Sequence, residues 1–332
     1  MKRVKIGVAG AGHLGRIHLK CIRDIPQLDL VGFYDSDPER SAEVANEMGI
    51  QSFADLEELL EVIDALDIVT PTVSHFLLAE KAMLKGKHVF IEKPVTATVT
   101  EGTALLELQI KRKLIAQVGH VERFNPAMLA IESLTIDPKF IEVHRLANFN
   151  PRGTDVSVVL DLMIHDLDII LKLVPSKIKR VLANGVCLVS KTPDIGNARI
   201  EWENGCVANV TASRMSFKNM RKMRIFQPDA YIGLDFLERS AQIIRMQEGP
   251  LLEPAEDINT FELETAEGVK TVKIEMPETQ PVNAIQMELS CFAESILTNT
   301  APEVGIDAAL EALKLAFHIS DEIQYNLDKA LA

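Results

Sequence analysis

Cysteine is scarce in this chain, and the few cysteines form no recognisable framework. The 332 residues include only Cys21, Cys187, Cys206 and Cys291, which are scattered and contain no C-x-x-C pair. This arrangement predicts neither a cysteine-based zinc site nor a disulfide scaffold, and it is typical of a reducing compartment. We therefore expect a cytoplasmic protein.

The chain also has fewer basic than acidic residues, and it has no long apolar run. Lys and Arg total 35 against 48 Asp and Glu, a formal net charge of −13 that argues against binding to nucleic acid or to an anionic membrane. No apolar run reaches the length of a membrane span. The apolar stretch after Met1 is broken by Gly7, Gly10 and Gly12, so it does not predict a signal peptide. The expected partner is therefore a small molecule, with no nucleic acid and no membrane.

The first predicted strand and the turn after it carry the most specific motif. An apolar run over residues 4–9 predicts a buried strand, and Gly10, Gly12 and Gly15 follow at G-x-G-x-x-G spacing. Gly10 permits a tight turn, Gly12 lets the backbone approach a pyrophosphate, and Gly15 lets the next helix pack on the sheet. The N–H groups at the start of that helix then point at the phosphates. The motif predicts a dinucleotide site.

An acidic residue after the second predicted strand supports this interpretation. Residues 28–34 form an apolar run that ends in Asp35, about twenty residues past the glycines, where a carboxylate is expected to hold a ribose 2′-hydroxyl. The alternative is a glycine-rich turn followed by a surface aspartate. Because Asp35 would repel a 2′-phosphate, we expect NAD rather than NADP, although Arg40 lies close in sequence.

The first 121 residues alternate apolar strands with helical patterns. This rhythm specifies a parallel sheet with right-handed crossovers, so we predict an α/β chain with a doubly wound Rossmann domain over residues 1–121. Ligands of such sheets bind beyond the carboxyl ends of the strands. The residues expected to contact the cofactor are Gly10, Gly12, His13, Leu14, Gly15, Asp35, Thr70, Pro71, Thr72, His75, Glu92 and Lys93.

Past residue 121 the pattern changes. Between residues 178 and 274 strand-like runs follow one another without intervening helices, and helical patterns return near the end of the sequence. This order predicts a second, α+β domain over residues 122–332, with a large, mostly antiparallel and open-faced sheet. We expect this domain to bind substrate. Its uncovered sheet face predicts a homodimer or homotetramer.

One apolar helix of the second domain carries three polar residues at helical spacing. Asp161 and His165 are four residues apart, and His165 and Asp168 are three apart, so all three lie on one stripe. Buried carboxylates beside an imidazole are costly unless they are paired or functional. A carboxylate can fix the tautomer of the imidazole while its free nitrogen takes a proton. The alternative is a polar helix face with a structural histidine.

A lysine follows the predicted strand at residues 87–91. Lys93 lies where the nicotinamide is expected, and its ammonium can stabilise negative charge that develops on a substrate oxygen. Pro94 restricts Lys93 to an extended backbone. The alternative is an exposed lysine in a strand-to-helix loop.

Further polar residues gather near the predicted domain junction and along one basic run. The junction residues, which are His120, Glu122, Arg123 and Asn125, either bind substrate or brace the hinge. The candidate substrate-binding residues are His120, Arg123, Asn125, Arg152 and Asp168. The basic run over residues 214–224 is either a solvated strand and loop or a phosphate-binding patch for a nucleotide-linked substrate.

Taken together, these motifs resemble a family, the glucose–fructose oxidoreductases, inositol dehydrogenases and MocA-like oxidoreductases. The resemblance covers essentially the whole chain. It is carried by residues 10–15 (GAGHLG), residues 85–94 (KGKHVFIEKP), and Asp161 with His165 and Asp168. It implies that Lys93 of the Glu-Lys-Pro motif, with Asp161 and His165 of the later helix, acts at the substrate hydroxyl.

Two stretches, residues 119–126 (GHVERFNP) and 161–166 (DLMIHD), look more like the branch that contains UDP-N-acetylglucosamine 3-dehydrogenases. That likeness would also give the basic run a diphosphate to bind. The chain departs from many family members at Met163, and again at Ser157 and Val158, where those members have glycines. The bulkier surface argues against the pose of a free sugar or inositol.

The resemblance implies an NAD-dependent dehydrogenase that transfers hydride between nicotinamide and a secondary alcohol of a sugar or nucleotide sugar, with UDP-N-acetylglucosamine oxidised at C3 as one candidate. In this interpretation His165 takes the hydroxyl proton, Lys93 stabilises the oxygen and Asp161 orients the pair. One alternative is a dehydrogenase of a free sugar or polyol such as inositol. Others are an elimination in which bound NAD is recycled, and a non-catalytic NAD-binding sensor or scaffold.

No metal centre is predicted. A hydride transfer of this kind needs none, and several histidines lack metal-ligand spacing with Cys, Asp or Glu. These are His13, His18, His75, His88 and His144.

Overall fold

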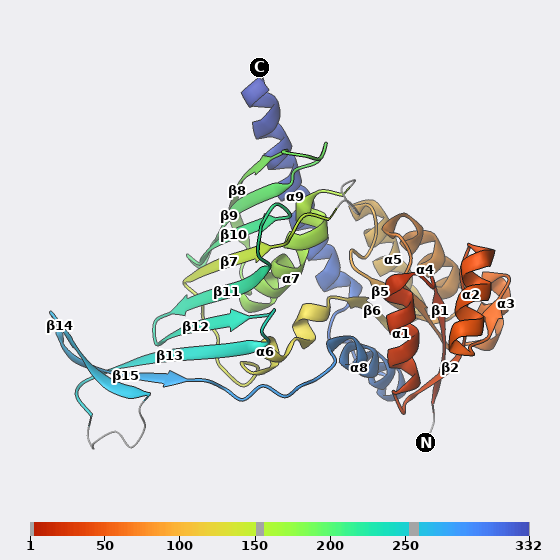
Figure 1. Ribbon diagram of the computed structural model, residues 1–332, viewed down its shortest axis with the longest axis horizontal. Helices are drawn as coiled ribbons and strands as arrows, with labels where there is room; N and C mark the ends of the chain where they lie inside the picture. Colours follow the sequence, from red (N-terminus) through yellow and green to blue (C-terminus); the bar gives the residue numbers. More distant parts are fainter. Residues whose placement is uncertain (1–2, 151–155, 252–258, 332) are drawn as a thin grey trace. The chain divides into compact units, whose positions relative to one another are not determined.

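The computed structural model describes residues 3–150, 156–251 and 259–331. The chain forms two compact units, described in turn and labelled by element in Figure 1. Unit 1 comprises Met1–Phe124 and Asn283–Lys314, and unit 2 comprises Asn125–Val282 and Leu315–Ala332.

Unit 1 is built on a six-stranded parallel sheet. Its strands are β1 Val4–Ala9, β2 Leu28–Tyr34, β3 Ser52–Phe53, β4 Ala65–Ile68, β5 His88–Glu92 and β6 Ala116–Gly119. The strand order is β3-β2-β1-β4-β5-β6, with β1 pairing in parallel with both β2 and β4. The strand order therefore reverses between β1 and β4, the point at which doubly wound sheets bind their ligands. The predicted Rossmann architecture is confirmed.

The helices of unit 1 begin and end where local chemistry specifies. They are α1 His13–Arg23, α2 Pro38–Met48, α3 Leu56–Val62, α4 His75–Leu84, α5 Val99–Arg112, α8 Ala284–Thr298 and the first part of α9 Ile306–Leu331, with single 3₁₀ turns at Thr72–Ser74 and Val121–Phe124. Asp37 accepts hydrogen bonds from two N–H groups of the first turn of α2, and Gly49 ends that helix at a φ of 61°. Thr98 and Glu101 form a reciprocal capping box at the start of α5.

Residues 283–314 pack within unit 1, whereas the sequence-based boundary places them in the second domain. The side chain of Gln117 on β6 donates a hydrogen bond of 2.8 Å to the carbonyl of Glu288 on α8. Phe292 of α8 packs edge to face on Phe90 of β5, with ring centroids 5.8 Å apart. Sequence order cannot reveal this return, because the periodicity of a helix does not say which sheet it covers.

Unit 2 is built on a nine-stranded sheet. Its strands are β7 Phe140–Leu146, β8 Ile178–Val186, β9 Ile195–Trp202, β10 Val207–Ser213, β11 Met220–Gln227, β12 Ala230–Asp235, β13 Ser240–Glu248, β14 Thr260–Thr265 and β15 Gly268–Glu275. The order is β14-β15-β13-β12-β11-β7-β10-β9-β8, and the β7–β10 pair is parallel within an otherwise antiparallel sheet. The prediction of a large, mostly antiparallel sheet is confirmed.

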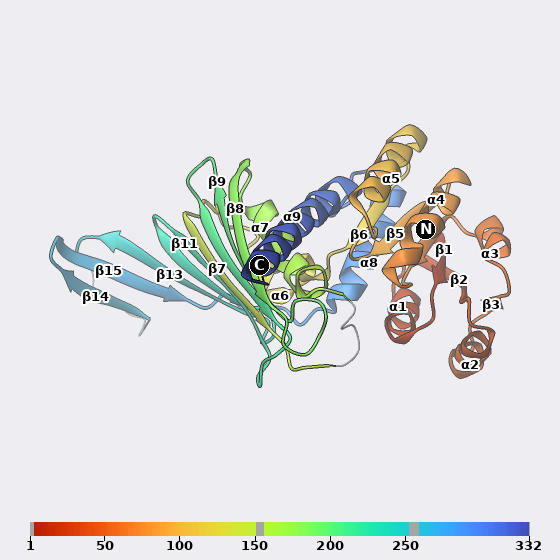
Figure 2. The ribbon, with the colours of Figure 1, turned by 90° about the horizontal axis from the view of Figure 1, so that it is seen from above.

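Helices cover one face of this sheet. They are α6 Pro126–Leu129, α7 Ile164–Leu173 with a π-helical turn at Val159–Met163 before it, and the last part of α9. Figure 2 shows α7 and the end of α9 on the same side, and Asn326 of α9 donates a hydrogen bond to the carbonyl of Ala183 on β8. Side chains along β7 and β9 alternate between buried and half-exposed or exposed, as expected when one face is covered. Within the described ranges, no helix is long and apolar enough to cross a membrane.

Candidate functional site

The three glycines after β1 have different structural roles at the point where the strand order reverses. Gly10 has a φ of 98°, and a Cβ there would lie 2.4 Å from the carbonyl oxygen of Val69. A Cβ on Gly15 would lie 2.0 Å from the carbonyl oxygen of Gly10, so this position allows α1 to approach the turn. A Cβ on Gly12 would meet nothing within 4 Å. Gly10 and Gly15 are therefore required by the fold, whereas Gly12 keeps open the space where a pyrophosphate fits.

An open hollow of ≈610 Å³ adjoins this turn. It is lined by Ala11, Gly12, His13, Arg16, Asp37, Glu39, Arg40 and Glu43. The hollow thus brings together two of the predicted cofactor residues, Gly12 and His13, with charged side chains of α1 and α2. Leu14, also predicted, is partly exposed in the first turn of α1.

Asp35 anchors the turn from the end of β2. Its Oδ2 accepts a hydrogen bond of 2.7 Å from the N–H of Ala11, and its Oδ1 accepts one of 2.9 Å from Asp37. The guanidinium of Arg40 lies 3.2 Å from Asp35 and 3.0 Å from Asp37. Two carboxylates therefore face one guanidinium, and this excess of negative charge opposes a 2′-phosphate. The arrangement fits NAD.

The end of β4 lies beside the glycine turn. Thr70 and Thr72 are half-buried and Pro71 is exposed, so all three are accessible from solvent. His75 is buried, with Nδ1 2.9 Å from the carbonyl oxygen of Pro94 and Nε2 2.9 Å from that of Thr70. Its ring thereby ties the end of β4 to the loop after β5.

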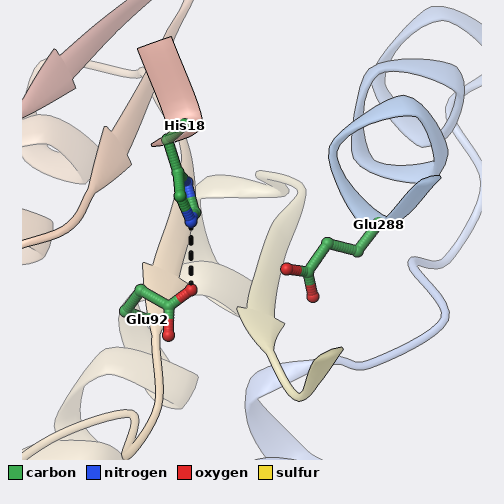
Figure 3. A group of neighbouring side chains, drawn as sticks. All are labelled: His18, Glu92 and Glu288. Atoms are coloured by element: carbon green, nitrogen blue, oxygen red, sulfur yellow. Dashed lines mark ion pairs between the residues drawn. The ribbon is translucent and has the colours of Figure 1, made fainter. Parts of the chain in front are cut away.

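Lys93 follows β5 and is half-buried, and its peptide bond to Pro94 is cis. Glu92 accepts a hydrogen bond of 3.1 Å from the backbone N–H of Lys93 through Oε2. Its other oxygen, Oε1, lies 3.3 Å from Nε2 of His18 in the interior of unit 1 (Figure 3). Glu92, predicted to contact the cofactor, therefore directs its carboxylate toward the core and holds the backbone of Lys93.

Sequence reasoning missed the buried polar cluster that Glu92 joins. His18 on α1, Asp67 on β4 and Glu288 on α8 are fully buried around it. Burial lowers the pKa of His18, but the Asp67 and Glu92 carboxylates outweigh it and raise that pKa well above its usual range. Burial and the neighbouring Glu92 and Asp67 carboxylates raise the pKa of Glu288 well above its usual range. Positions so far apart in sequence carry no spacing signal.

The helix of unit 2 that carries Asp161, His165 and Asp168 begins as a π-helical turn. Asp161 lies in this turn, at Val159–Met163, and His165 lies in the first turn of α7. Both are half-buried, whereas Asp168 is buried. π-Helical turns inside helices occur frequently at functional sites.

A second carboxylate of α7 is neutralised by an arginine that sequence reasoning did not single out. Asp166 and Arg145 of β7 are both buried and form a two-pronged ion pair, with Nε–Oδ2 at 2.6 Å and Nη2–Oδ1 at 2.9 Å. Arg145 falls on the helix-covered side of β7, with Ile141 and Val143. A strand-alternation pattern that places an arginine among core residues is the signal that could have indicated it.

The predicted substrate residues are divided between the two units. His120 and Arg123 are buried in unit 1, and Arg123 donates to the carbonyl of Glu303 at 3.4 Å. Asn125, in unit 2, caps α6 through the N–H of Ala127. Arg152 lies outside the described residues.

Acidic residues accompany much of the basic run. Lys222 lies 3.2 Å from Asp235. Arg224 lies 2.8 Å from Glu142 on the neighbouring strand β7. These pairs support the interpretation of this part of the run as a solvated strand.

Another unpredicted feature of unit 2 is the loop that binds the carboxylate of Asp194. Its Oδ2 accepts hydrogen bonds from the consecutive N–H groups of Leu188, Val189 and Ser190, at 2.7, 2.8 and 3.0 Å. Burial raises the pKa of Asp194, but hydrogen bonds from Ser190, Val189 and Leu188 outweigh it and lower the pKa to about 2. The carboxylate therefore organises this loop.

Comparison with known proteins places these features in a family. Residues 4–120 match the family described as "Oxidoreductase family, NAD-binding Rossmann fold", and residues 138–230 match the GFO/IDH/MocA C-terminal domain. The chain is 37% identical over 297 residues to UDP-N-acetylglucosamine 3-dehydrogenase of Acidithiobacillus ferrooxidans, covering 89% of this chain and 90% of that one. A solved structure of UDP-N-acetylglucosamine 3-dehydrogenase from Acidithiobacillus ferrooxidans superposes with a TM-score of 0.87 at 33% identity, covering 98% of this chain and 99% of that one.

Inositol dehydrogenases are also similar over a shorter span. The scyllo-inositol 2-dehydrogenase (NAD(+)) of Bacillus subtilis is 33% identical over 234 residues, which covers 64% of this chain and 68% of the relative. The glycine turn, the hollow beside it and the acidic end of β2 agree with the matched NAD-binding fold. The chain therefore belongs to the Gfo/Idh/MocA family and is an NAD-binding oxidoreductase.

Proposed function

We propose that this oxidoreductase acts on the 3-hydroxyl of UDP-N-acetylglucosamine. One observation carries the proposal: the similarity to the enzyme of that name spans 89% of this chain, and so extends through most of both units. A similarity confined to the Rossmann sheet would indicate only which cofactor is bound, and nothing about the substrate. Met163, in the helix that carries Asp161 and His165, is fully buried, so the expectation that its bulk alters the surface facing the substrate is wrong.

We propose that Lys93, Asp161 and His165 perform the chemistry. Bound NAD supplies the hydride acceptor. The imidazole of His165 takes the proton of the substrate hydroxyl, because a neutral imidazole is a base suited to neutral pH. The ammonium of Lys93 stabilises the negative charge on that oxygen. The carboxylate of Asp161 orients the imidazole. Lys93 belongs to unit 1 and the other two residues to unit 2, so their meeting at one substrate is part of this proposal.

The substrate is tested by following NADH absorbance with a panel of alcohols. The panel contains UDP-N-acetylglucosamine, UDP-N-acetylgalactosamine, free N-acetylglucosamine, scyllo-inositol and myo-inositol. We expect turnover with UDP-N-acetylglucosamine and a product oxidised at C3. The similarity to scyllo-inositol 2-dehydrogenase makes a free polyol the second candidate. Turnover with an inositol but not with the UDP-sugar would overturn the substrate proposal.

The residue roles are tested with Lys93→Met and His165→Asn. Each is expected to lower turnover about a hundredfold or more while NAD affinity changes little, because each removes a group that acts in the transition state. Lys111→Met and His318→Asn, at exposed positions on α5 and α9, are the matched controls and should retain full turnover. Unchanged turnover in both site variants would refute the assignment.

We also propose that copies of the chain associate through the open face of the nine-stranded sheet. Figure 2 shows no described helix of unit 2 on this face, and exposed apolar side chains such as Leu182 and Phe226 occur on its strands. Light scattering after gel filtration should give the mass of a dimer or tetramer. A monomer at micromolar concentration would contradict this proposal.

A further inference from the structure

The strongest unassigned feature of unit 1 is a group of three buried side chains, which we call the His18–Glu92–Glu288 cluster. One potential ligand atom from each residue lies within 4.8 Å of the other two. The side chains come from α1, β5 and α8, and Figure 3 shows them converging on one space. His18 and Glu288 are fully buried and Glu92 is 9% exposed. This is an interior site, distinct from the hollow at the glycine turn.

Glu288 is the least satisfied member of the cluster. Both oxygens of its carboxylate are buried, and neither has a hydrogen-bond partner among the described residues. Figure 3 shows the carboxylate directed from α8 toward His18 and Glu92. Buried polar atoms are nearly always paired in folded proteins, and an unpaired one calls for a water, a proton or an ion. The orientation of Glu288 therefore indicates a ligand in the space between the three side chains.

The imidazole of His18 is held as a metal-binding histidine usually is. Its Nδ1 lies 2.9 Å from Oδ2 of Asp67, a contact that fixes the ring and directs Nε2 toward Glu92. Metal-ligating histidines almost always donate their second ring N–H to a carboxylate, a carbonyl or a water in this way. Nε2 makes no hydrogen bond within the part of the chain that the structure describes. A cation that binds at Nε2 would displace the proton from this nitrogen, as metal binding to histidine requires.

The balance of charge also favours a cation. Asp67, Glu92 and Glu288 place three carboxylates around one imidazole in the interior of unit 1. Even an imidazolium would neutralise only one of them. A bound divalent ion is often the largest positive charge at such a site and compensates for buried carboxylates directly.

We propose that Nε2 of His18 and the carboxylates of Glu92 and Glu288 bind one divalent transition-metal ion. One imidazole and two carboxylates suit Zn²⁺, Mn²⁺ or Co²⁺, whereas soft ions require thiolates and Ca²⁺ requires six to eight oxygens. Bond lengths of about 2.0–2.2 Å place two ligand atoms at most about 4.4 Å apart. The three ligand atoms all lie within 4.8 Å of one another, so at most a small side-chain movement brings them to these distances.

The proposed ion is structural and takes no part in hydride transfer. It links α8, which lies near the end of the sequence, to α1 and β5 of the Rossmann domain. Because Oε2 of Glu92 accepts the N–H of Lys93, the ion also steadies the backbone that carries this lysine. The inference does not depend on the identity of the substrate.

The test uses the untagged full-length chain, purified after growth with added ZnCl₂ or MnCl₂ and dialysed against metal-free buffer. Plasma mass spectrometry should find about one Zn²⁺ or Mn²⁺ per chain, and at least about tenfold less in Glu288→Gln. Glu294→Gln, at an exposed position of the same helix, is the matched control and should retain the ion. In a second measurement a chelator first removes the metal. Adding ZnCl₂ or MnCl₂ back should then raise the unfolding temperature by about 5 °C or more, and only when Glu288 is present.

Two results would overturn the proposal. One is wild-type protein that contains no more metal than the dialysis buffer after growth with either ion, together with an unfolding temperature that neither ion raises. Protons alone would then neutralise the cluster. The other is equal retention of metal by both proteins, which would place the ion elsewhere. The wild-type measurements alone decide the first point, so the proposal remains testable even if Glu288→Gln fails to fold.

Discussion

Replacing Arg145 by methionine is expected to destabilise unit 2 strongly. The substitution keeps a long side chain but removes the guanidinium that neutralises Asp166, which is 1% exposed. Removing one partner of a buried ion pair leaves an uncompensated charge in the interior and typically costs about 3–5 kcal/mol. Asp166→Asn should cost a similar amount, because it leaves the arginine buried instead.

The double variant Arg145→Met/Asp166→Leu separates charge from packing. Replacing both charges of a buried pair by apolar groups of similar volume is often nearly neutral, so we expect it to lie within about 2 kcal/mol of the wild type. The coupling energy obtained from the two single variants and the double variant should therefore be several kcal/mol. Additive losses would show that the two residues stabilise the unit independently.

The chain contains its own probe for this measurement. Trp202 is the only tryptophan and is buried in β9 of the same sheet, so its fluorescence during urea unfolding reports on unit 2. Arg224→Met is the matched control, because Arg224 pairs with Glu142 at 2.8 Å on a partly exposed part of the sheet. Such surface pairs contribute about 0–1 kcal/mol. A loss in Arg145→Met no larger than that of the control would refute the reasoning.

Three further predictions concern the glycine turn, cofactor preference and pH. Gly12→Val should preserve the fold of unit 1, since a Cβ there meets nothing within 4 Å, but should weaken NAD binding about tenfold or more in a calorimetric titration. Asp35→Ala should reduce the preference for NAD over NADP, measured as the ratio of their dissociation constants, because it removes a carboxylate that opposes a 2′-phosphate; an unchanged ratio would count against that role. The pKa of Asp194 is about 2 in the folded chain against an ordinary 3.8, so its stabilising effect is complete above about pH 4 and is lost as the pH falls toward 2. The urea midpoints of wild type and Asp194→Asn should therefore converge over that range, and a constant difference would contradict the assignment.

Local patterns in the sequence were sufficient to predict most of the fold. The alternation of strands and helices specified the parallel sheet of unit 1, and strand-like runs between residues 178 and 274 correspond to β8 through β15. What the sequence did not indicate depends on contacts between distant segments. Glu288 of α8 meets Gln117 of β6 because two separate parts of the chain share one core, and no local period encodes that choice.

In the candidate site, too, local features could be predicted from the sequence, whereas features that depend on distant segments could not. The spacing of Gly10, Gly12 and Gly15 sufficed to predict the turn, because the constraint acts within six consecutive residues. The core-directed carboxylate of Glu92 and the bracing role of His75 could not be predicted, since each depends on a neighbour from another element. The roles of Lys93 and His165 in catalysis stay predictions, to be decided by the turnover measurements.

Because of the π-helical turn at Val159–Met163, the directions in which Asp161 and His165 point around the helix axis depend on the number of residues in that turn as well as on residue identity. A π-turn holds one residue more than an α-turn, and each residue of an α-helix advances the chain by about 100°. Deleting one residue from this turn would therefore leave α7 in place and rotate the residues before the deletion about the helix axis. A relative that has lost that residue would keep both side chains in an alignment yet aim them differently, so single-residue gaps here are a place to look for altered substrate choice.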